Sequence, residues 1–427
     1  MNKLSIAGLL AVALSLVLNA CGGGGGGGSG SAPSAEAALA STIRNDTRLP
    51  LVRAKARQVV AKNLSAGTVY AAVYIRDLNT FIDLAIESHG APVVRSQLLQ
   101  FFEFQADDGL IPDAIEPNGN LLRATVESDQ ESSLVQAVGK YVAATGDTAL
   151  LSQQVRGVPV IERMEKALMY LYTQRFAAPY RLVWGGTRAD WGDVQPEDSP
   201  GTNLTENSHP SISIYDNAML ALALVHLQTL ERAAGRDATP WTARQADLRT
   251  AVRAHLWTGT QFIPHLYLEK GSPFPASFDE ARIYFQGGTA VAIQAGLLEP
   301  AEVELTFARM IKNKVDSGSG TVGVTLYPSY PANFFANTFW MGPEYHYQNG
   351  GDWPWFGGRI IQQMVARGQP QMAHQEIGPM LDRVLRDDGF YEWYSRDGKG
   401  QGSAEYRGSA GQIALAIDML LQWANAH

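Results

Sequence analysis

Apolar residues recur along most of the chain at intervals of three and four positions, and strict alternation of apolar and polar residues is rare and short. This spacing is typical of helices that bury one face. It predicts twelve helices, over residues 49–63, 77–88, 92–105, 130–144, 148–177, 211–233, 239–256, 286–294, 300–313, 354–367, 370–386 and 408–424. We therefore expect an all-α protein.

Very short turns alternate with long irregular segments between these helices. Thr145-Gly146-Asp147 and Gly368-Gln369-Pro370 are turns that fit antiparallel helix neighbours. The long segments fit functional loops gathered at one end of the molecule. Six antiparallel pairs arranged in this way describe an (α/α)6 toroid. An irregular α-solenoid is the alternative, but it predicts a fixed repeat of about 34–47 residues, which the sequence lacks.

The first 40 residues differ in composition from the rest of the chain. An apolar run from Leu4 to Leu18 is typical of a secretory signal peptide, and the run ends beside Cys21 in a motif similar to the bacterial lipobox. We expect residues 1–20 to be a lipoprotein signal peptide and Cys21 to carry the lipid; an ordinary signal peptide with a chance cysteine is the alternative. A Gly-rich run predicts a flexible tether over residues 21–40, followed by one folded domain over residues 41–427.

The bulk composition limits the partners and the location of the protein. With 34 basic and 42 acidic side chains the formal net charge is −8, which argues against a nucleic-acid partner. Cys21 is the only cysteine, so no disulfide can form within the chain. We expect a lipid-anchored protein of the outer membrane and periplasm or of the cell surface, in contact with the membrane through its anchor alone.

A segment that leads into the predicted helix 354–367 has an unusual composition. Residues 345–358 combine aromatic rings, an amide pair, an imidazole, a carboxylate and glycines. Aromatic faces beside hydrogen-bonding side chains are what a carbohydrate pocket requires. A helix cap built by Trp353-Pro354-Trp355 is the alternative. The candidate substrate-binding residues of this segment are Tyr347, Gln348, Asn349, Gly350, Asp352, Trp353 and Trp355.

Two other loops join carboxylates to aromatic rings. Cleavage of a glycosidic bond requires one carboxylic acid and one carboxylate on opposite faces of the anomeric carbon. Asp193 is the candidate acid because the neighbouring ring of Trp191 is expected to favour its protonated form. Glu392, between two aromatic residues in a Gly-flanked loop, is the candidate base. Solvated surface carboxylates are the alternative for both. Further substrate-binding candidates in these loops are Trp184, Asp190, Trp191 and Trp393.

A third candidate group precedes the helix predicted over residues 77–88. Tyr74, Arg76 and Asp77 offer a ring, a fork of donors and an acceptor suited to a hexose, although a salt bridge at a helix start is equally natural. Asp216 fits either a helix cap or a sugar ligand, and we favour the cap. The histidines have no partners at metal-ligand spacing, and no phosphate-binding Gly-rich loop occurs. We predict no metal and no cofactor.

The order and the amino-acid sequences of these segments resemble those of the six-hairpin glycosidases. This superfamily includes glycogen-debranching glucosidases, the family 63 α-glucosidases with their glycosylglycerate-hydrolase relatives, and the neutral invertases. Residues 345–355 are similar to the Tyr-His-x-Gly-x-x-Trp-Pro signature of these groups, and residues 74–81 to their Arg-Asp-x-x-x-Phe sugar-binding segment. Residues 128–147 resemble their third or fourth helix. The likeness runs in scattered motifs from about residue 70 to the end of the sequence.

The resemblance also implies roles for the carboxylates. Residues 190–193 match the Trp-x-Asp acid segment, and Asp190 competes with Asp193 for the acid position; we favour Asp193 because related phosphorylases have a similar Asp-Trp-x-Asp whose second aspartate is the acid. Glu392 matches the base segment better than Glu405 does. The resemblance implies an inverting mechanism with carboxyl groups roughly 6.5–9.5 Å apart. Arg76 and Asp77 would then hold the terminal sugar, with tryptophans walling its site.

Together, these features predict an inverting glycoside hydrolase that releases a terminal hexose, most readily α-linked glucose, from a small glycoside or an oligosaccharide. A sucrose-cleaving hydrolase is one alternative, because residues 348–351 are similar to the corresponding sequence motif of the invertases. A sugar-binding lipoprotein without catalysis is the other; it would keep the aromatic platform but would need no pair of carboxylates.

Overall fold

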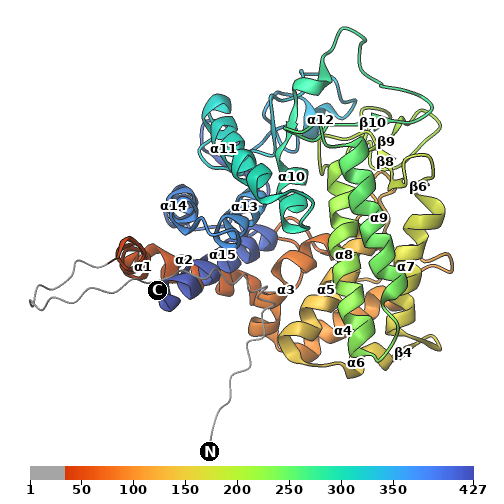
Figure 1. Ribbon diagram of the computed structural model, residues 1–427, viewed down its shortest axis with the longest axis horizontal. Helices are drawn as coiled ribbons and strands as arrows, with labels where there is room; N and C mark the ends of the chain where they lie inside the picture. The colour runs from red at the N-terminus through yellow and green to blue at the C-terminus, as the bar shows by residue number, and fades with distance from the viewer. Residues whose placement is uncertain (1–33) are drawn as a thin grey trace, which may run out of the picture.

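The computed structural model describes residues 34–427. Within this range the long helices alternate along the chain between an outer and an inner position (Figure 1). The outer helices are α2 (Arg48–Val60), α4 (Ala91–Glu103), α7 (Val160–Gln174), α9 (Thr239–His255), α11 (Pro300–Ser317) and α14 (Pro370–Asp387). The inner helices are α3 (Ile75–His89), α5 (Gln130–Thr145), α8 (Ile214–Ala233), α10 (Gln286–Gln294), α13 (Pro354–Ala366) and α15 (Arg407–Ala426).

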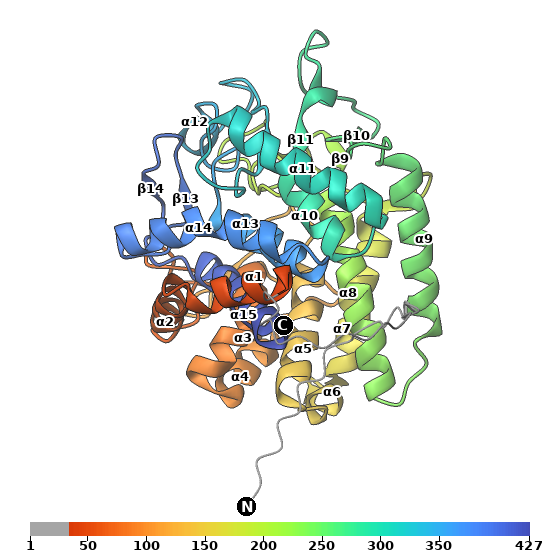
Figure 2. The ribbon, with the colours of Figure 1, turned by 60° about the vertical axis from the view of Figure 1, so that its left-hand side comes forward.

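The inner helices form a closed ring. Each packs against the next, from α3 through α5, α8, α10 and α13 to α15, and α15 returns to contact α3. The last helix also packs against α2 and against the short α1 (Ala35–Asn45), which lies beside it in Figure 2. The predicted (α/α)6 toroid is therefore confirmed, with α15 and α2 completing the sixth pair.

The hydrophobic pattern explains which helices are inner and which are outer. In α8 every residue from Ile214 to Leu224 is buried, and in α10 every residue from Gln286 to Ile293. In α9, by contrast, only Trp241, Leu248, Ala251 and Val252 are buried, along one stripe. A helix that is apolar on all sides must be covered on all sides, and one with a single stripe can face water. This difference places the two sets in separate layers.

Short antiparallel strands tie the loops together at the end where the inner helices begin. Three sheets of this kind join loops from different helix pairs: β1 (Val73–Tyr74) with β2 (Ala114–Ile115) and β3 (Leu121–Leu122), β8 (Gly185–Gly186) with β9 (Pro210–Ile212) and β10 (Leu266–Tyr267), and β11 (Tyr284–Phe285) with β12 (Leu326–Tyr327). Two local hairpins at this end are β6 (Phe176–Ala177) with β7 (Leu182–Val183), and β13 (Trp393–Tyr394) with β14 (Gly400–Gln401). A third hairpin, β4 (Gln154–Val155) with β5 (Val158–Pro159), lies between α6 (Ala149–Ser152) and α7 at the other end of the molecule (Figure 1).

The structure differs from the predicted elements at several places. The helix predicted over residues 148–177 is divided into α6 (Ala149–Ser152), the β4–β5 hairpin and α7, because Gly157 has a φ of +77° and Pro159 donates no backbone hydrogen bond. Residues 35–40, predicted as part of the tether, begin α1. Two other short helices, α12 (Thr338–Met341) and the 3₁₀ helix η1 (Glu280–Arg282), lie in loops.

The predicted signal peptide, the Gly-rich run and Cys21 lie outside the described residues. Among residues 34–427, no helix combines the length and the apolar character needed to cross a bilayer. The same part of the chain has no group of three or more His, Cys, Asp or Glu side chains arranged to hold a metal ion.

Glycines allow the inner helices to approach one another closely around α15. A Cβ atom on Gly411 of α15 would lie 2.6 Å from the Cα atom of Phe81 in α3. A Cβ atom on Gly358 of α13 would lie 2.7 Å from the backbone carbonyl carbon of Gln412. Both approaches are to backbone atoms, so a larger residue cannot be accommodated by a side-chain movement alone. These glycines set the spacing at which the ring closes.

We therefore expect Gly411→Ala and Gly358→Ala each to reduce the stability of the fold by about 1–3 kcal/mol, the usual effect of overpacking a core. The change is measured as a lower midpoint of thermal unfolding. Gln422→Ala, at an exposed position of α15, is the matched control and should change stability by less than about 0.5 kcal/mol. Equal midpoints for Gly411→Ala and the control would contradict the packing described above.

Candidate active site

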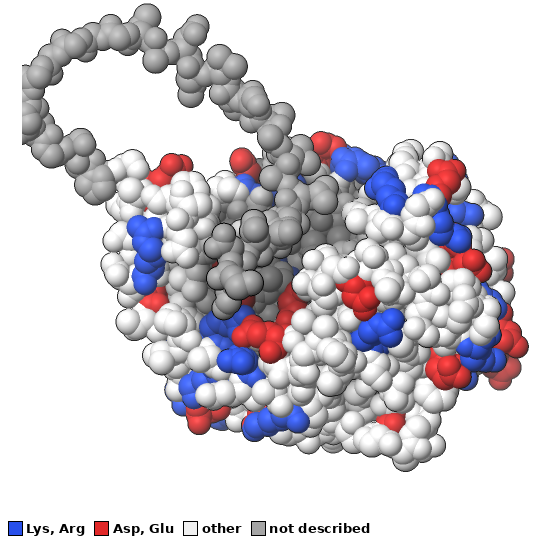
Figure 3. Space-filling model, turned by 90° about the horizontal axis from the view of Figure 1, so that it is seen from below, with Lys and Arg blue, Asp and Glu red and all other residues white. Residues whose placement is uncertain are grey.

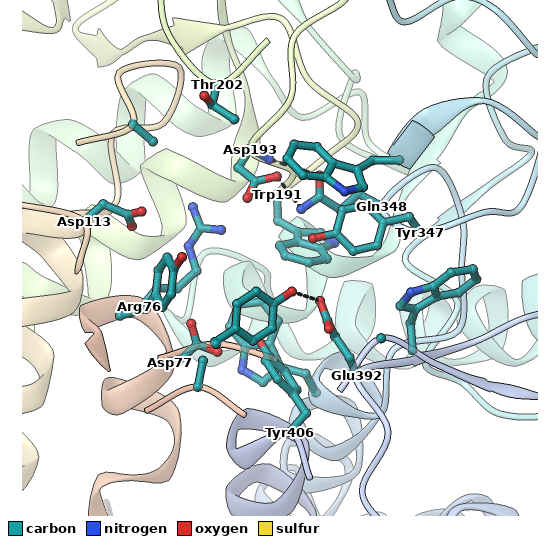
Figure 4. Close-up of a pocket in the computed structure, with 18 of the residues that line it drawn as sticks. Arg76, Asp77, Asp113, Trp191, Asp193, Thr202, Tyr347, Gln348, Glu392 and Tyr406 are labelled. Atoms are coloured by element: carbon teal, nitrogen blue, oxygen red, sulfur yellow. Dashed lines mark hydrogen bonds between the residues drawn. The ribbon is translucent and has the colours of Figure 1, made fainter. Parts of the chain in front are cut away.

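A cavity of about 820 Å³ opens where α3, α13 and α15 begin. Its wall is built by loops from widely separated parts of the chain, namely the residues before α3, the segment before α5, the segment that follows Trp191, the segment before α13, and the β13–β14 hairpin. Figure 4 shows the main side chains that point into it. Convergence of these loops on one site follows from the toroid, because each of them precedes an inner helix.

Glu392 is held rigidly in this wall. Its Oε1 accepts a hydrogen bond of 2.8 Å from the Tyr70 hydroxyl, and its Oε2 accepts one of 3.1 Å from the backbone N–H of Ser403. Gly402 makes room for the side chain, because a Cβ atom there would lie 2.9 Å from the Glu392 Cβ. The β13–β14 hairpin thus fixes the position of one carboxylate.

The surroundings of Glu392 favour its neutral form. Burial raises the pKa of Glu392 to about 7, and the charges of Asp77 and Asp193 add to this increase. The hydrogen bond from Tyr70 acts in the opposite direction, because it stabilises the ionised carboxylate. A carboxyl group with a pKa near neutrality is suited to taking up and releasing a proton.

Asp193 faces the cavity from another loop and is held by Gln348. The Gln348 amide Nε2 donates to Asp193 Oδ1 at 2.6 Å, and the Asp193 backbone N–H donates to Gln348 Oε1 at 3.2 Å. This reciprocal pair fixes both the backbone and the side chain of Asp193. In Figure 4, Asp193 and Glu392 lie on different sides of the same space, each with its own hydrogen-bond partner.

Arg76 forms the centre of a buried ionic cluster at the opposite wall. Its Nε and Nη2 donate to the two carboxylate oxygens of Asp129, at 2.9 and 3.0 Å, and Nη2 also ion-pairs with Glu127. The Tyr215 hydroxyl donates to Asp129 Oδ2 at 3.0 Å. Next to this cluster, burial raises the pKa of Asp77 to about 6. Arg76 is therefore engaged mainly by protein carboxylates.

Aromatic rings form a further part of the wall. Trp191 packs edge-on against Trp353 and Trp355, with ring centroids 4.6 and 5.0 Å apart, and these pairs hold one another in place. The Trp353 indole N–H donates to the backbone carbonyl of Tyr347 at 2.9 Å. Trp393 lies against His346 with centroids 4.6 Å apart. Such a wall offers apolar ring faces and edges to a sugar.

Most of the residues predicted from the sequence line this one cavity. They are Tyr74, Arg76, Asp77, Trp191, Asp193, Tyr347, Gln348, Trp353, Trp355, Glu392 and Trp393. They come from loops far apart in the sequence, and the toroid brings them together.

Asp190 and Asp352 were predicted to bind substrate, but the structure places both away from the cavity lining. Both oxygens of Asp190 accept the backbone N–H of Gly288 at 3.0 Å, so this carboxyl caps the start of α10. Asp352 accepts hydrogen bonds from Ser319 and Thr321 and forms a 2.6 Å ion pair with Arg383 of α14. Their carboxylates are already engaged in holding the fold.

Trp184, Asn349 and Gly350 also lie outside the lining. The Asn349 side chain exchanges two hydrogen bonds with the backbone of Tyr330, at 2.8 and 2.9 Å, and so fixes a loop. The ring of Trp184 packs under the guanidinium group of Arg175, whose Cζ lies 4.8 Å from the centroid of the Trp184 ring. Gly350 has a φ of +88° and supplies a turn. Asp216, for which we favoured a helix cap, instead ion-pairs with buried Arg188.

Several lining residues were not predicted. Tyr70 and Asp113 follow no motif that singles them out, and Tyr406 is the residue before the last helix. Phe339 is 83 % exposed at the mouth of the cavity, on α12, which the helical periodicity missed because it spans a single turn. The others are Ala66, Val69, Leu122, Arg123, Ala124, Glu127, Thr202, Asn203, Trp340, His346, Gln401 and Gly402. Tyr406 is an aromatic residue two positions before the helix predicted over residues 408–424, and that was the signal available for it.

The outer surface carries charges of both signs. On the face seen from below in Figure 3, Lys and Arg side chains are interspersed with Asp and Glu side chains. The cavity differs from this face, because its lining contains five acidic residues, Asp77, Asp113, Glu127, Asp193 and Glu392, and two basic ones, Arg76 and Arg123.

Comparison with known proteins gives structural neighbours only. No protein-family model matches the sequence, and no curated protein matches it. A family 63 mannosylglycerate hydrolase from Thermus thermophilus, in complex with Tris and D-glycerate, is similar over 85 % of this chain and 99 % of its own, with a TM-score of 0.62 and 14 % identity.

Two rhamnosidases are similar as well. The Klebsiella oxytoca enzyme with rhamnose bound matches 87 % of this chain and 63 % of its own, with a TM-score of 0.59 and 14 % identity. The family 78 rhamnosidase of Bacillus sp. GL1 matches 87 % of this chain and 34 % of its own, with a TM-score of 0.59 and 16 % identity. The closed double ring of helices and the similarity to these solved structures show that the chain has the six-hairpin (α/α)6 fold of these glycosidases.

Proposed function

We propose that this protein is a glycoside hydrolase whose acid is Asp193 and whose base is Glu392. The observation that carries the proposal is the placement of these two carboxyl groups in one cavity, each fixed by its own partners, beside a wall of tryptophan rings. A binding protein would need the rings but has no use for a carboxyl group whose pKa burial raises to about 7. The fold is shared with several glycosidases.

In the proposed reaction, the ionised Glu392 removes a proton from a water molecule as that water attacks the anomeric carbon. Asp193 donates its proton to the glycosidic oxygen, the carbon–oxygen bond breaks, and the sugar leaves with the opposite anomeric configuration. Gln348 occupies Asp193 Oδ1, so Oδ2 is the oxygen available to donate. Tyr70 and Ser403 orient Glu392 toward the water. The inverting route is the one that the resemblance to six-hairpin glycosidases implies, and it requires room for a water molecule between the two carboxyl groups.

We further propose that the glycone is a terminal hexose and that α-linked glucose is the preferred one. Arg76 and Asp77 are in the lining, as the resemblance to six-hairpin glucosidases implies for the terminal sugar. The family 63 mannosylglycerate hydrolase from Thermus thermophilus has also been solved in complex with glucose, and that structure matches this chain at 15 % identity and a TM-score of 0.59. Its binding is a property of that protein and here supports only the choice of test substrate.

The first test is proton NMR of the purified chain with α-glucosides and sucrose. We expect β-glucose to appear first, and Asp193→Asn and Glu392→Gln each to lower kcat by about 10²–10⁴-fold, because each removes one proton transfer. Asp397→Asn is the matched control, since Asp397 lies exposed in the same hairpin as Glu392. Cleavage of sucrose alone would favour the invertase-like alternative. Sugar binding without cleavage would favour the binding lipoprotein.

The second test uses the pH dependence of kcat/KM. Since Glu392 acts as an ionised base and burial raises its pKa to about 7, activity should fall as the pH decreases through neutrality. Tyr70→Phe removes a hydrogen bond that stabilises the ionised form, so the acidic limb should move to higher pH by about one unit. Tyr74 packs against Tyr70 with ring centroids 5.8 Å apart, and Tyr74→Phe is the matched control. This variant should leave the acidic limb of the pH profile unchanged. An unchanged limb in Tyr70→Phe would show that Glu392 is not the titrating base.

We also propose that the protein is anchored by a lipid on Cys21 and faces the periplasm or the cell surface. The test is fractionation of cells that express the chain or its Cys21→Ser variant. We expect the parent chain in the membrane fraction and the variant in the soluble fraction, since no other anchor is predicted. Equal partition of both forms would contradict the anchor.

A further inference from the structure

Asp113 is a lining residue with no assigned role, and its backbone is rigidly placed. It directly precedes β2 in the three-stranded sheet that joins the loops before α3 and α5. Its N–H donates to the carbonyl of Leu122 at 2.9 Å, and its carbonyl accepts the N–H of Ile75 at 3.0 Å. The sheet therefore fixes where this side chain enters the cavity, next to the start of α3.

The Asp113 carboxylate has no protein partner to satisfy it within residues 34–427. The residue is only 9 % exposed, and burial raises its pKa to about 7, although the charge of Arg76 acts in the opposite direction. Arg76 directs Nε and Nη2 to Asp129 and Glu127 instead. A buried acceptor without a donor is costly and is normally satisfied by a protein group, water or a ligand.

Asp77, on the same side of the cavity, accepts a hydrogen bond from the Tyr406 hydroxyl but also has one oxygen without a partner in the described part of the chain. It is 7 % exposed, and its Oδ1 is buried without a hydrogen-bond partner among the described residues. Figure 4 shows Asp77 and Asp113 on either side of Arg76, across the cavity from Glu392. The cavity therefore has two carboxylates, Asp77 and Asp113, in addition to Asp193 and Glu392.

Asp77 and Asp113 would contact a different part of a bound sugar from Asp193 and Glu392. Asp193 and Glu392 act at the anomeric carbon in the proposed mechanism, so a bound pyranose presents its other ring edge, with the C3, C4 and C6 hydroxyls, to the far wall. These hydroxyls are donors, and a pair of buried acceptors is the complement that they require. A glycone that lacks them, or whose hydroxyls are substituted, would leave a buried carboxylate unpaired.

We propose that Asp113, together with Asp77, accepts hydrogen bonds from the glycone hydroxyls opposite the anomeric carbon and so restricts the site to an unsubstituted terminal hexose. This inference rests on the proposed glycosidase function and deepens it. Asp113 is then a specificity-determining residue that binds substrate, and Arg76 positions the site through its ion pairs while Asp77 and Asp113 make the contacts. Chains extended at the far edge of the sugar are excluded by the same contacts.

The test is calorimetric binding, which does not depend on cleavage. Glucose, mannose and galactose are compared first, and the tightest of them is then compared with its 3-deoxy, 4-deoxy and 6-deoxy forms. We expect at least one deoxy form to bind about 100-fold more weakly, because a buried carboxylate loses its donor. Asp113→Ala should weaken binding of the parent hexose by a similar factor and should weaken binding of that deoxy form little further.

If the losses in affinity from Asp113→Ala and from removal of the hydroxyl do not add, Asp113 contacts that hydroxyl. A variant whose site is merely destabilised would instead bind all of the sugars more weakly by the same factor. Asp107→Asn, whose side chain is 98 % exposed in the same loop, is the matched control. Independent, additive losses, or deoxy forms that bind as tightly as the parent hexose, would overturn the role of Asp113 while leaving the hydrolase intact. If none of the three hexoses binds, the carbohydrate pocket and this inference both fail.

Discussion

The buried ion pairs of Arg76 with Asp129 and Glu127 are the interaction on which the site depends. They join α3 to the start of α5, two neighbours in the inner ring, at the point where the cavity wall begins. Burying a charge is expensive unless it is paired and hydrogen-bonded, and here the two-pronged contact with Asp129 and the hydroxyl of Tyr215 meet that requirement. Among residues 34–427, Asp77, Asp113 and Glu392 in the lining form no ion pair. Burial raises the pKa of each of these three carboxyl groups, and no paired cation offsets that increase.

The same logic separates structural from chemical carboxylates. Asp352 receives donors from Ser319, Thr321 and Arg383, and both oxygens of Asp190 accept the Gly288 N–H, so both carboxylates hold elements together. Asp77 and Asp113 receive few or none and face the cavity. Asp193 and Glu392 lie between these extremes, because each is oriented by donors yet remains at the cavity surface. Engagement by protein donors and access to the cavity, taken together, thus separate the structural carboxylates from the chemical ones.

The sequence sufficed for the fold because helical periodicity is a local property and six helix pairs repeat it. It also identified the segments that meet at the cavity, since rings and carboxylates between helices are unusual. It could not separate Asp190 from Asp193, because the partner of Asp190 is the N–H of Gly288, far along the chain. Asp352 was misassigned for the same reason, its partner Arg383 being on α14. Asp113 was missed because its position depends on a sheet that joins two separate loops.

Closure of the ring by α15 has a consequence for how the protein is made. Of the described helices, α1, α2 and α3 emerge from the ribosome first, and all three pack against a helix synthesised more than three hundred residues later. Until α15 arrives, the surfaces that it covers remain open to solvent and to other chains, and contacts so distant in sequence form slowly. Tyr406 and the β13–β14 hairpin, which complete the cavity, lie beside that last helix. The site is therefore assembled at the end of synthesis, and a partly made chain has no cavity in which to act prematurely.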